Sequence, residues 1–433
     1  MTEVEHTAFT PTKQLLGRAK KKFKPESARK GEPSFIMTPE MRKLSTPWSV
    51  ASIRASQIDP GSLPAGVILD VAAGSGVQLI AFSKFLNRPA LGIEIDEQVA
   101  LLCAANMQLN SEDGVQRSLD RVLVGDGCAA DSAVSAYWAS LREGGTRAHP
   151  PISMLHLDPA RPPDAQNHHV DEMQPDLKSA LKAWSRHLQV GTRGPAVILD
   201  LSPRLDSVQR AMVDGILETS FPGIARTWEW LSQGGGRVDR LSVWIGSLSS
   251  KSARRCLRIG RKKVISRIEG TPKVAQPVFF ERAPDFGAWL SIVDPSLFES
   301  GLQDSWLSKA VRSGSGSSWV RIEGRRPLLI HTDPLSDDDD VQGFLVASGK
   351  IVQHRLSPPN LNNIDLVASS AVRNGIGKIT LRCSLDPEIH PTLQRRLHKA
   401  LKGAEGSGAF IVDMDLNRGA ASRSLYLICK EAM

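Results

Sequence analysis

Two carboxylates and two glycines at regular spacing are the most chemically informative residues of this chain. An apolar run ends in Asp70 and is followed by Gly74 and Gly76, and a second apolar run ends at Glu94. An apolar strand, a glycine turn and a helix in succession bring the backbone close to a nucleotide-like ligand at the edge of an α/β sheet. A carboxylate at the end of the second strand suits a ribose diol, because it can accept two hydroxyl hydrogen bonds. The spacing therefore predicts a site for a ligand that contains a nucleoside.

Two classes of ligand use this layout. Nicotinamide dinucleotides favour a third glycine in the turn, and Leu79 stands at that position. S-adenosyl-L-methionine carries no phosphate, and its amino and sulfonium groups are cationic, so the carboxylate of Asp70 before the turn suits it. These residues favour S-adenosyl-L-methionine as the cofactor. The alternative is an ordinary α/β turn that holds no ligand.

Two further apolar runs also end in acidic residues. Asp126 follows the third run, where its carboxylate suits the exocyclic amine of an adenine or, alternatively, caps the next helix. The fourth run ends at Asp158, which either orients a methyl acceptor and takes its proton or serves as a turn acid. Pro159 fixes the backbone beside it. Arg161 suits a phosphate or a base edge, with a structural ion pair as its alternative role.

The composition is that of a globular protein with an excess of positive charge. The chain has 433 residues, 41% of them apolar, which is enough for two or three domains, and no apolar run is long enough to cross a bilayer. The start of the chain lacks the apolar segment of a signal peptide, and the five cysteines lack C-x-x-C spacing. We therefore expect a cytoplasmic protein with neither disulfides nor a metal site. The net charge of +8 gathers in basic clusters near 20–30, 254–263 and 395–402, which fits a nucleic-acid partner or simply a soluble surface.

The alternation of strand and helix signals predicts an α/β fold with more than one domain. We expect a basic N-terminal arm over 1–40, a doubly wound domain over 41–270, a linker region over 271–319 and a second domain over 320–433. The Ser-Gly tract at 313–318 is typical of a flexible linker. Strands are predicted at 67–71, 90–95, 121–125, 152–157 and 196–201, with a closing antiparallel pair at 225–231 and 238–246.

Several segments together carry a resemblance to a known family. They are Asp70–Gly76, Gly92–Asp96, Asp158–Arg161 and Leu201–Asp206, with 374–379 and 386–403 in the C-terminal part. Through them the chain resembles the class I S-adenosylmethionine-dependent methyltransferases, and more narrowly the prokaryotic subfamily with a C-terminal THUMP-like domain. The resemblance implies a Rossmann-like methyltransferase sheet over 41–270 and an α+β THUMP-like domain over 320–433.

The same resemblance assigns roles to individual residues. It implies a cofactor shell made of Asp70, Ala72, Gly74, Gly76, Glu94 and Asp126. It also implies an acceptor motif made of Asp158, Pro159 and Arg161. Ala72 replaces the usual first glycine of the turn, which is tolerable if its φ is negative. Ser202 stands where RNA 5-methyluridine enzymes carry a cysteine, which disfavours a cysteine adduct.

THUMP-type domains bind structured RNA, so the resemblance implies a partner and a reaction. We expect a methyltransferase acting on a base of tRNA or rRNA, with a base nitrogen as the favoured acceptor. Two alternatives stay open. One is a protein or small-molecule methyltransferase, and the other is a non-catalytic RNA-binding protein that keeps the fold.

Overall fold

The computed structural model describes residues 5–111, 117–160, 169–273, 282–321, 324, 326–355, 357–418 and 421–431. The chain forms two compact units, which we describe separately. The N-terminal unit comprises Met1–Trp230, Asp239–Ala253 and Ile259–Val264, and the C-terminal unit comprises Leu231–Val238, Arg254–Arg258 and Ile265–Met433.

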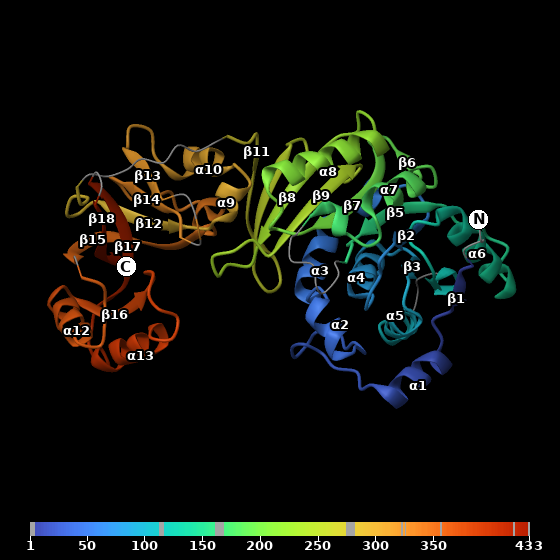
Figure 1. Cartoon of the computed structure of the whole chain (residues 1–433), viewed down its shortest axis with the longest axis horizontal. Coiled ribbons are helices and arrows are strands. Elements are labelled where there is room, and N and C mark those ends of the chain that lie inside the picture. The colour runs from blue at the N-terminus through green and yellow to red at the C-terminus, as the bar shows by residue number, and fades with distance from the viewer. Residues whose placement is uncertain are drawn as a thin grey trace. The chain divides into compact units, whose positions relative to one another are not determined.

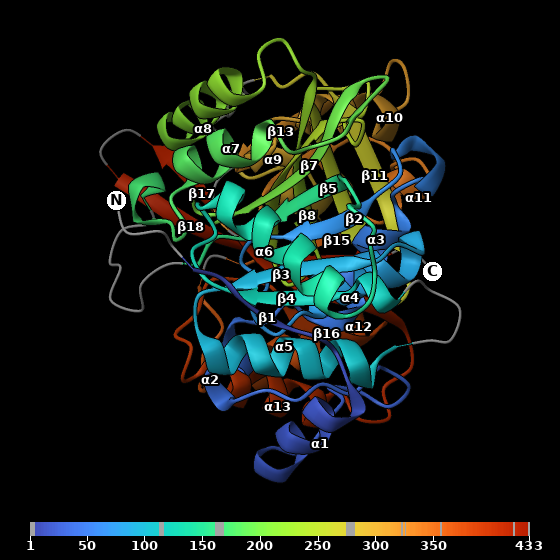
Figure 2. The ribbon, with the colours of Figure 1, turned by 90° about the vertical axis from the view of Figure 1, so that its right-hand side faces the viewer.

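The N-terminal unit is built on a mostly parallel sheet (Figures 1 and 2). Its strands are β1 (Thr7–Phe9), β2 (Val67–Asp70), β3 (Ala90–Glu94), β4 (Arg121–Val124), β5 (Ile152–Leu157), β6 (Val190–Gly191), β7 (Gly194–Leu201), β8 (Arg226–Ser232) and β9 (Arg240–Gly246). They lie in the order β1-β4-β3-β2-β5-β7-β9-β8, with β6 paired to β7. Strands β2 to β5 and β7 pair in parallel, whereas β9 is antiparallel to β7. The predicted strands between 67 and 246 all form, with ends within two residues of the predicted ones.

Helices cover both faces of this sheet, which explains why every residue of β2, β5 and β7 is buried. They are α1 (Lys13–Lys22), α2 (Pro39–Leu44), α3 (Trp48–Ser56), α4 (Val77–Leu86), α5 (Glu97–Leu109), α6 (Ala130–Glu143), α7 (Leu177–Ser185) and α8 (Ser207–Ser220). Helix α3 packs on α4 and α1 on α5, while α6, α7 and α8 contact one another in sequence. Figure 2 shows α6 to α8 grouped on one side of the strands and α5 on the other.

The described part of the basic segment 1–40 packs on the N-terminal unit. Strand β1 pairs antiparallel with β4, from Thr7 opposite Val124 to Phe9 opposite Val122. Leu15 and Ala19 of α1 are buried in the same apolar core as α4 and α5. The edge strand and the amphipathic helix thus belong to the folded unit, with Lys20, Lys21 and Lys22 in the last turn of α1.

The C-terminal unit contains a second, mostly antiparallel sheet. After β10 (Arg254–Ile259) and β11 (Val264–Gly270), its elements are β12 (Trp289–Val293), α9 (Ser296–Glu299), α10 (Gln303–Ala310), β13 (Ser317–Arg321), β14 (Leu328–His331), α11 (Asp339–Gln342), β15 (Leu345–Arg355), α12 (Ile364–Arg373), β16 (Ile376–Leu381), α13 (His390–Ala400), β17 (Ser407–Arg418) and β18 (Ala421–Glu431). The strand order is β13-β14-β12-β15-β18-β17-β16, and only the β16–β17 pair among its described pairings is parallel. Helices α12 and α13 share a core with β16 and its neighbours.

The segment expected as a linker carries folded elements in its described part. Within 271–319 the chain forms β12, α9, α10 and the start of β13, with Trp306 fully buried. Ser317 and Ser318 of the Ser-Gly tract pair with β14. A local excess of serine and glycine therefore accompanies a turn and an edge strand here, because backbone pairing and a buried tryptophan supply the order that composition does not reveal.

Among the described helices, none is long and apolar enough to cross a membrane.

Candidate functional site

The carboxyl ends of four parallel strands bring the predicted acids to one edge of the sheet. The order β4-β3-β2-β5 places Asp126, Glu94, Asp70 and Asp158 after neighbouring strands. Along the chain the strands first proceed from β2 toward β4 and then from β5 toward β7, so the connection direction reverses between β2 and β5. Ligands of open α/β sheets bind beside such a reversal, at the carboxyl ends of the strands.

The glycine turn between β2 and α4 has the predicted backbone. Gly74 and Gly76 have positive φ angles of 52° and 79°, and Gly76 caps α4. A Cβ on Gly76 would lie 2.8 Å from Sγ of Cys103, whereas a Cβ on Gly74 would meet no atom within 4 Å. Asn87 is the only described residue other than glycine with positive φ, so Ala72 fits its place in the turn. The turn thus packs tightly on α5 at Gly76 and is open at Gly74.

Glu94 holds this turn in place. Its Oε2 accepts a hydrogen bond from the amide of Gly74 at 2.9 Å, and its Oε1 accepts one from Ile95 at 3.0 Å. Burial raises the pKa of the Glu94 carboxyl, against the effect of the amides. Oε1 also accepts a hydrogen bond from the amide of Asp96 at 3.3 Å, so about one of the roughly four acceptor positions of the carboxylate is left for a ribose hydroxyl.

Ile95 is a candidate site residue that the motif search missed. It follows Glu94 directly, and 76% of its surface is exposed, which is unusual for a large aliphatic side chain at a strand end. An exposed apolar side chain next to the carboxylate that is expected to bind a ribose suits the flat face of a base. The detectable signal is an isoleucine between two acids, Glu94 and Asp96.

Asp126 lies at the end of β4 in an exposed turn. Its Oδ1 accepts a hydrogen bond from the amide of Cys128 at 2.8 Å. Helix α6 begins only at Ala130, with Ala129 at the N-cap, so the alternative role of Asp126 as a helix cap is wrong. The carboxylate stabilises a local turn and stays open to solvent.

His156 lies between two carboxylates inside the sheet, and no sequence motif marks it. Its Nδ1 is 2.9 Å from Oδ2 of Asp70, and its Nε2 is 3.1 Å from Oδ2 of Asp200. Ionised carboxylates only accept hydrogen bonds, so this geometry calls for a proton on both ring nitrogens. Burial lowers the pKa of His156, but Asp70 and Asp200 outweigh it and raise that pKa to about 9.

Asp200 is the centre of a buried charge network. Its Oδ2 accepts from Nη1 of Arg54 at 2.8 Å and from Nη1 of Arg240 at 2.7 Å, while Ser242 donates to Oδ1. Burial alone would raise the pKa of Asp200, but Arg54 and Arg240 hold it well below the usual range. The side chains of Asp200 and Arg54 are at most 1% exposed. Removing one partner of such a network would leave a buried charge uncompensated, which is strongly destabilising.

The network reaches the surface at Asp158. Oδ2 of Asp158 accepts from Nε2 of Gln78 at 2.9 Å and from Nη1 of Arg240 at 3.1 Å. Gln78 in turn accepts from Arg54 through its Oε1, so a closed ring of hydrogen bonds joins Asp158, Gln78, Arg54, Asp200 and Arg240. Neither contact uses Oδ1 of Asp158, and the side chain is 37% exposed. The buried ring thus presents one carboxylate oxygen at the sheet edge.

Asp70, expected in the cofactor shell, lies at the end of β2 with its carboxylate buried. It is only 2% exposed, with Oδ2 bound to His156 and Oδ1 accepting from the amide of Ala72 at 3.3 Å. Its carboxylate therefore lies behind the glycine turn and supports that turn. With a protonated His156, three cations balance three carboxylates in this part of the molecule: Arg54, Arg240 and His156 against Asp70, Asp158 and Asp200.

The rest of the acceptor motif is partly described. Pro159 is buried, and Ala160 forms two backbone hydrogen bonds with Gln174, of 2.8 and 2.9 Å, which fixes the chain after Asp158. Arg161 lies outside the described residues. The connection between α2 and α3 borders the site from another side, because Ser45 contacts Ser75 through their hydroxyls and Thr46 accepts from Arg240.

No family model and no curated protein matches this chain. Solved structures resemble it, among them a putative methyltransferase from Porphyromonas gingivalis, with a TM-score of 0.55 and 12% identity over 97% of this chain and 89% of that one. Human methyltransferase-like protein 13 in complex with SAH has a TM-score of 0.29 and 20% identity over 48% of this chain and 82% of that one. A putative methyltransferase from Streptococcus mutans in complex with SAH has a TM-score of 0.29 and 14% identity over 47% of this chain and 98% of that one. The first similarity spans both units, and with the strand order it shows that the chain has the α/β fold of a class I methyltransferase.

Proposed function

We propose that this protein is an S-adenosylmethionine-dependent methyltransferase that acts on a base of tRNA or rRNA. One observation carries the proposal: a buried ring of charges holds Asp158 at the sheet edge that also bears the glycine turn and Glu94. A structural network alone has no need to present a carboxylate oxygen at that edge. The proposed compartment is the cytoplasm, where such RNA is found.

The cofactor side of the site suits a nucleoside with a cationic tail. Glu94 binds the ribose hydroxyls, Ile95 packs on the adenine and Asp126 accepts from its amine. The open backbone at Gly74 lets the remainder of the ligand approach the turn closely. Asp70 acts through the turn that it supports. When bound, S-adenosyl-L-methionine supplies a methyl group on a positively charged sulfur.

On the acceptor side, Asp158 orients the substrate. Its Oδ2 is held by Gln78 and Arg240, so its Oδ1 keeps a defined direction. That oxygen would accept a hydrogen bond from the N–H of a base nitrogen and would take its proton as the nitrogen gains the methyl group, with the neutral thioether of the cofactor as the leaving group. Pro159 limits the backbone freedom of the motif, and Arg161 supplies a donor fork for a phosphate or a base edge.

The basic clusters support RNA as the substrate class, although they are not equivalent. Arg395 and Lys399 are exposed on α13, whereas Arg396 pairs with Asp365. In the cluster at 254–263, Arg254 donates to the carbonyl of Ser300 at 2.8 Å. The exposed groups of α1 and α13 therefore carry the argument for phosphate contacts.

Cofactor binding is tested by calorimetry on the full chain. Wild type is expected to bind S-adenosyl-L-methionine, and Glu94→Ala to weaken that binding at least tenfold. The control Glu97→Ala removes an exposed carboxylate three residues along the chain and is expected to change nothing. Absence of binding in wild type would favour the non-catalytic alternative.

The substrate is tested by mass spectrometry of nucleosides from the total RNA of a deletion strain. One methylated nucleoside is expected to disappear, to return with the wild-type gene and to stay absent with Asp158→Ala. If every nucleoside persists while the cofactor binds, a protein or small molecule is the substrate instead.

A further inference from the structure

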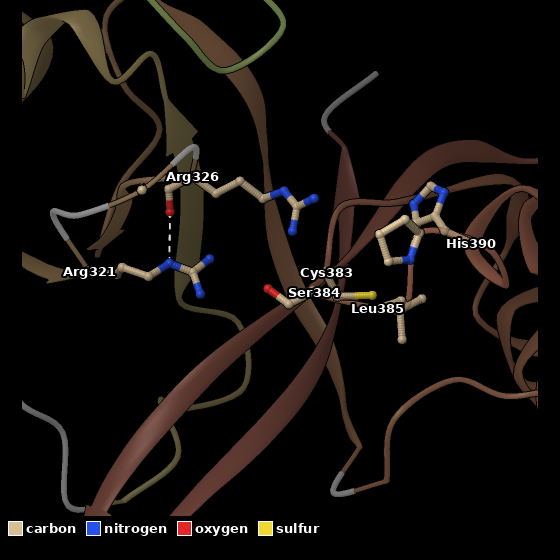
Figure 3. A pocket seen from close by; sticks show the side chains of 8 residues that line it. Arg321, Arg326, Cys383, Ser384, Leu385 and His390 are labelled. Atoms are coloured by element: carbon tan, nitrogen blue, oxygen red, sulfur yellow. Dashed lines mark hydrogen bonds between the residues drawn. The ribbon is translucent and has the colours of Figure 1, made fainter. Parts of the chain in front are cut away.

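The C-terminal unit contains a cavity of about 540 Å³ that the proposed methyl transfer does not use. Residues of the β13–β14 hairpin line one side and residues between β16 and α13 line the other. Figure 3 shows the lining side chains of Arg321, Arg326, Cys383, Ser384, Leu385 and His390. The two guanidinium groups and the Ser384 hydroxyl face the same space in this view.

Among the residues that the structure describes around this cavity, arginines outnumber the carboxylates that could balance their charge. Nη1 of Arg321 lies 3.3 Å from Oδ2 of Asp413, which is 6% exposed and whose Oδ1 already accepts from the amide of Ser384. Burial lowers the pKa of the Arg326 guanidinium; Asp413 acts against this effect, and the neighbouring Arg321 and Arg382 add to it. Asp413 is thus one carboxylate among three arginines.

Two guanidinium groups have donors left for a ligand. Nη2 of Arg321 is buried and has no hydrogen-bond partner among the described residues. The side chain of Arg326 forms no hydrogen bond or ion pair with any residue in the described part of the chain. A buried donor without an acceptor is costly, and an anion with several oxygens would satisfy both groups.

The other lining groups do not supply that anion. The cavity-lining residues that the structure describes include no aspartate or glutamate. Burial, with help from Asp413, raises the pKa of the Cys383 thiol to about 12, so the thiol is neutral at physiological pH. His390 uses Nε2 on the carbonyl of Leu381 at 3.3 Å. Among the described lining residues, none therefore supplies an anion to these guanidinium groups.

We infer that this cavity binds a phosphoryl group, through the guanidinium groups of Arg321 and Arg326 and the hydroxyl of Ser384. Two planar donor forks match the oxygens of a tetrahedral phosphate better than a single carboxylate. The volume accommodates more than the phosphate, so the group belongs to a nucleotide or to a nucleic-acid strand. The inference concerns the C-terminal unit and does not depend on methyl transfer.

Calorimetry with inorganic phosphate, at constant ionic strength set with chloride, tests the inference on the full chain without S-adenosylmethionine. Wild type is expected to bind, and Arg326→Gln to weaken binding at least tenfold. Arg373→Gln removes the same charge from an exposed position at the end of α12 and is expected to retain affinity within about twofold, because phosphate contact and not net charge decides binding. Arg326→Lys keeps the charge but loses the fork, and an intermediate loss is expected.

Two further ligands identify the source of the phosphate. Adenosine 5′-monophosphate and a 5′-phosphorylated oligoribonucleotide bind better than the 5′-hydroxyl oligonucleotide if the cavity takes a terminal phosphate. Equal binding of both oligonucleotides indicates a backbone phosphodiester. The inference is overturned if wild type binds no phosphate, or if Arg326→Gln and Arg373→Gln weaken binding equally while melting at the wild-type temperature.

Discussion

At the scale of single residues, the protonation of His156 decides whether the charges of the site balance. The imidazole is fully buried, and both of its nitrogens face carboxylate oxygens. A neutral imidazole has one donor, so it would leave one carboxylate facing a lone pair. The proton therefore stabilises both the sheet core and the turn that Asp70 supports.

This linkage predicts a loss of stability in alkaline solution. The pKa of His156 rises from 6.5 to about 9 on folding. Its contribution is fully present below about pH 6.5 and is lost as the pH rises through about 9, with a magnitude on the order of 1 to 3 kcal/mol. Urea unfolding between pH 6 and 10 measures it. The plot of unfolding free energy against pH is expected to be flatter for His156→Gln than for wild type. The control His149→Gln alters an exposed histidine and is expected to keep the wild-type slope. Equal slopes in all three proteins would refute the protonated state of His156.

Asp158 and Asp200 both pair with Arg240, but their substitution is expected to affect different properties. Replacing Asp200 is expected to lower stability, and replacing Asp158 to lower the rate of methyl transfer. Asp200→Asn leaves Arg54, Arg240 and His156 undercompensated in the core and is expected to cost about 3 to 5 kcal/mol of unfolding free energy. Asp158→Asn changes a partly exposed carboxylate, so its effect on stability is expected to be below about 1 kcal/mol. Its effect on methyl transfer is expected to be at least about a hundredfold.

Denaturation curves and transfer of a labelled methyl group to RNA from the deletion strain measure the two effects. Calorimetry with the cofactor serves as the control, because Asp158→Asn is expected to bind it like wild type. A variant with full activity would remove Asp158 from the acceptor site.

At the scale of elements, the turn between β2 and α4 is the part most sensitive to backbone geometry. Gly76→Ala would place a Cβ at a φ of 79° and 2.8 Å from Cys103. The expected cost is about 1 to 3 kcal/mol of unfolding free energy, together with weaker cofactor binding. Gly17→Ala in α1 is the matched control, because a Cβ there meets nothing within 4 Å, and it is expected to be neutral or stabilising. Thermal unfolding of both variants measures the difference. Equal melting temperatures would contradict the expected strain at position 76.

The elements of the N-terminal unit could be predicted from sequence because most of its central strands are largely apolar runs bounded by glycines or acids. Residues 152–157 show this, since the predicted and observed bounds are the same. The packed elements within 271–319 could not be predicted in the same way. Their order depends on long-range contacts such as the burial of Trp306, and local composition does not encode these contacts.

The strand-end acids were visible in the sequence, but the network behind Asp158 was not. Arg54, Gln78 and Arg240 lie far from it in sequence and meet only after the sheet forms. His156 and Asp200 left a detectable signal, because each interrupts an apolar run that must be buried on both faces. A polar residue in such a strand needs a partner, and the sequence does not name that partner.

At the scale of the whole molecule, the distribution of charge bears on the substrate. The net charge of +8 includes arginines that are used inside the fold, such as Arg54 and Arg240. Basic groups on α13 are accessible to an external polyanion, since Arg395 and Lys399 are exposed. Contacts with phosphates release counterions, so they leave a measurable dependence on salt.

We therefore expect the affinity for bulk tRNA to fall linearly with salt on logarithmic axes. The double variant Arg395→Gln/Lys399→Gln is expected to reduce the slope by about 1.4 to 1.8, because each lost phosphate contact removes about 0.7 to 0.9. The control Lys178→Gln/Lys182→Gln removes the same charge from exposed positions on α7 and is expected to keep the wild-type slope. Fluorescence anisotropy with labelled tRNA over a series of salt concentrations measures all three proteins. An affinity that does not depend on salt would argue against RNA as the substrate, and equal slopes for the two double variants would show that net charge, rather than the α13 surface, attracts the RNA.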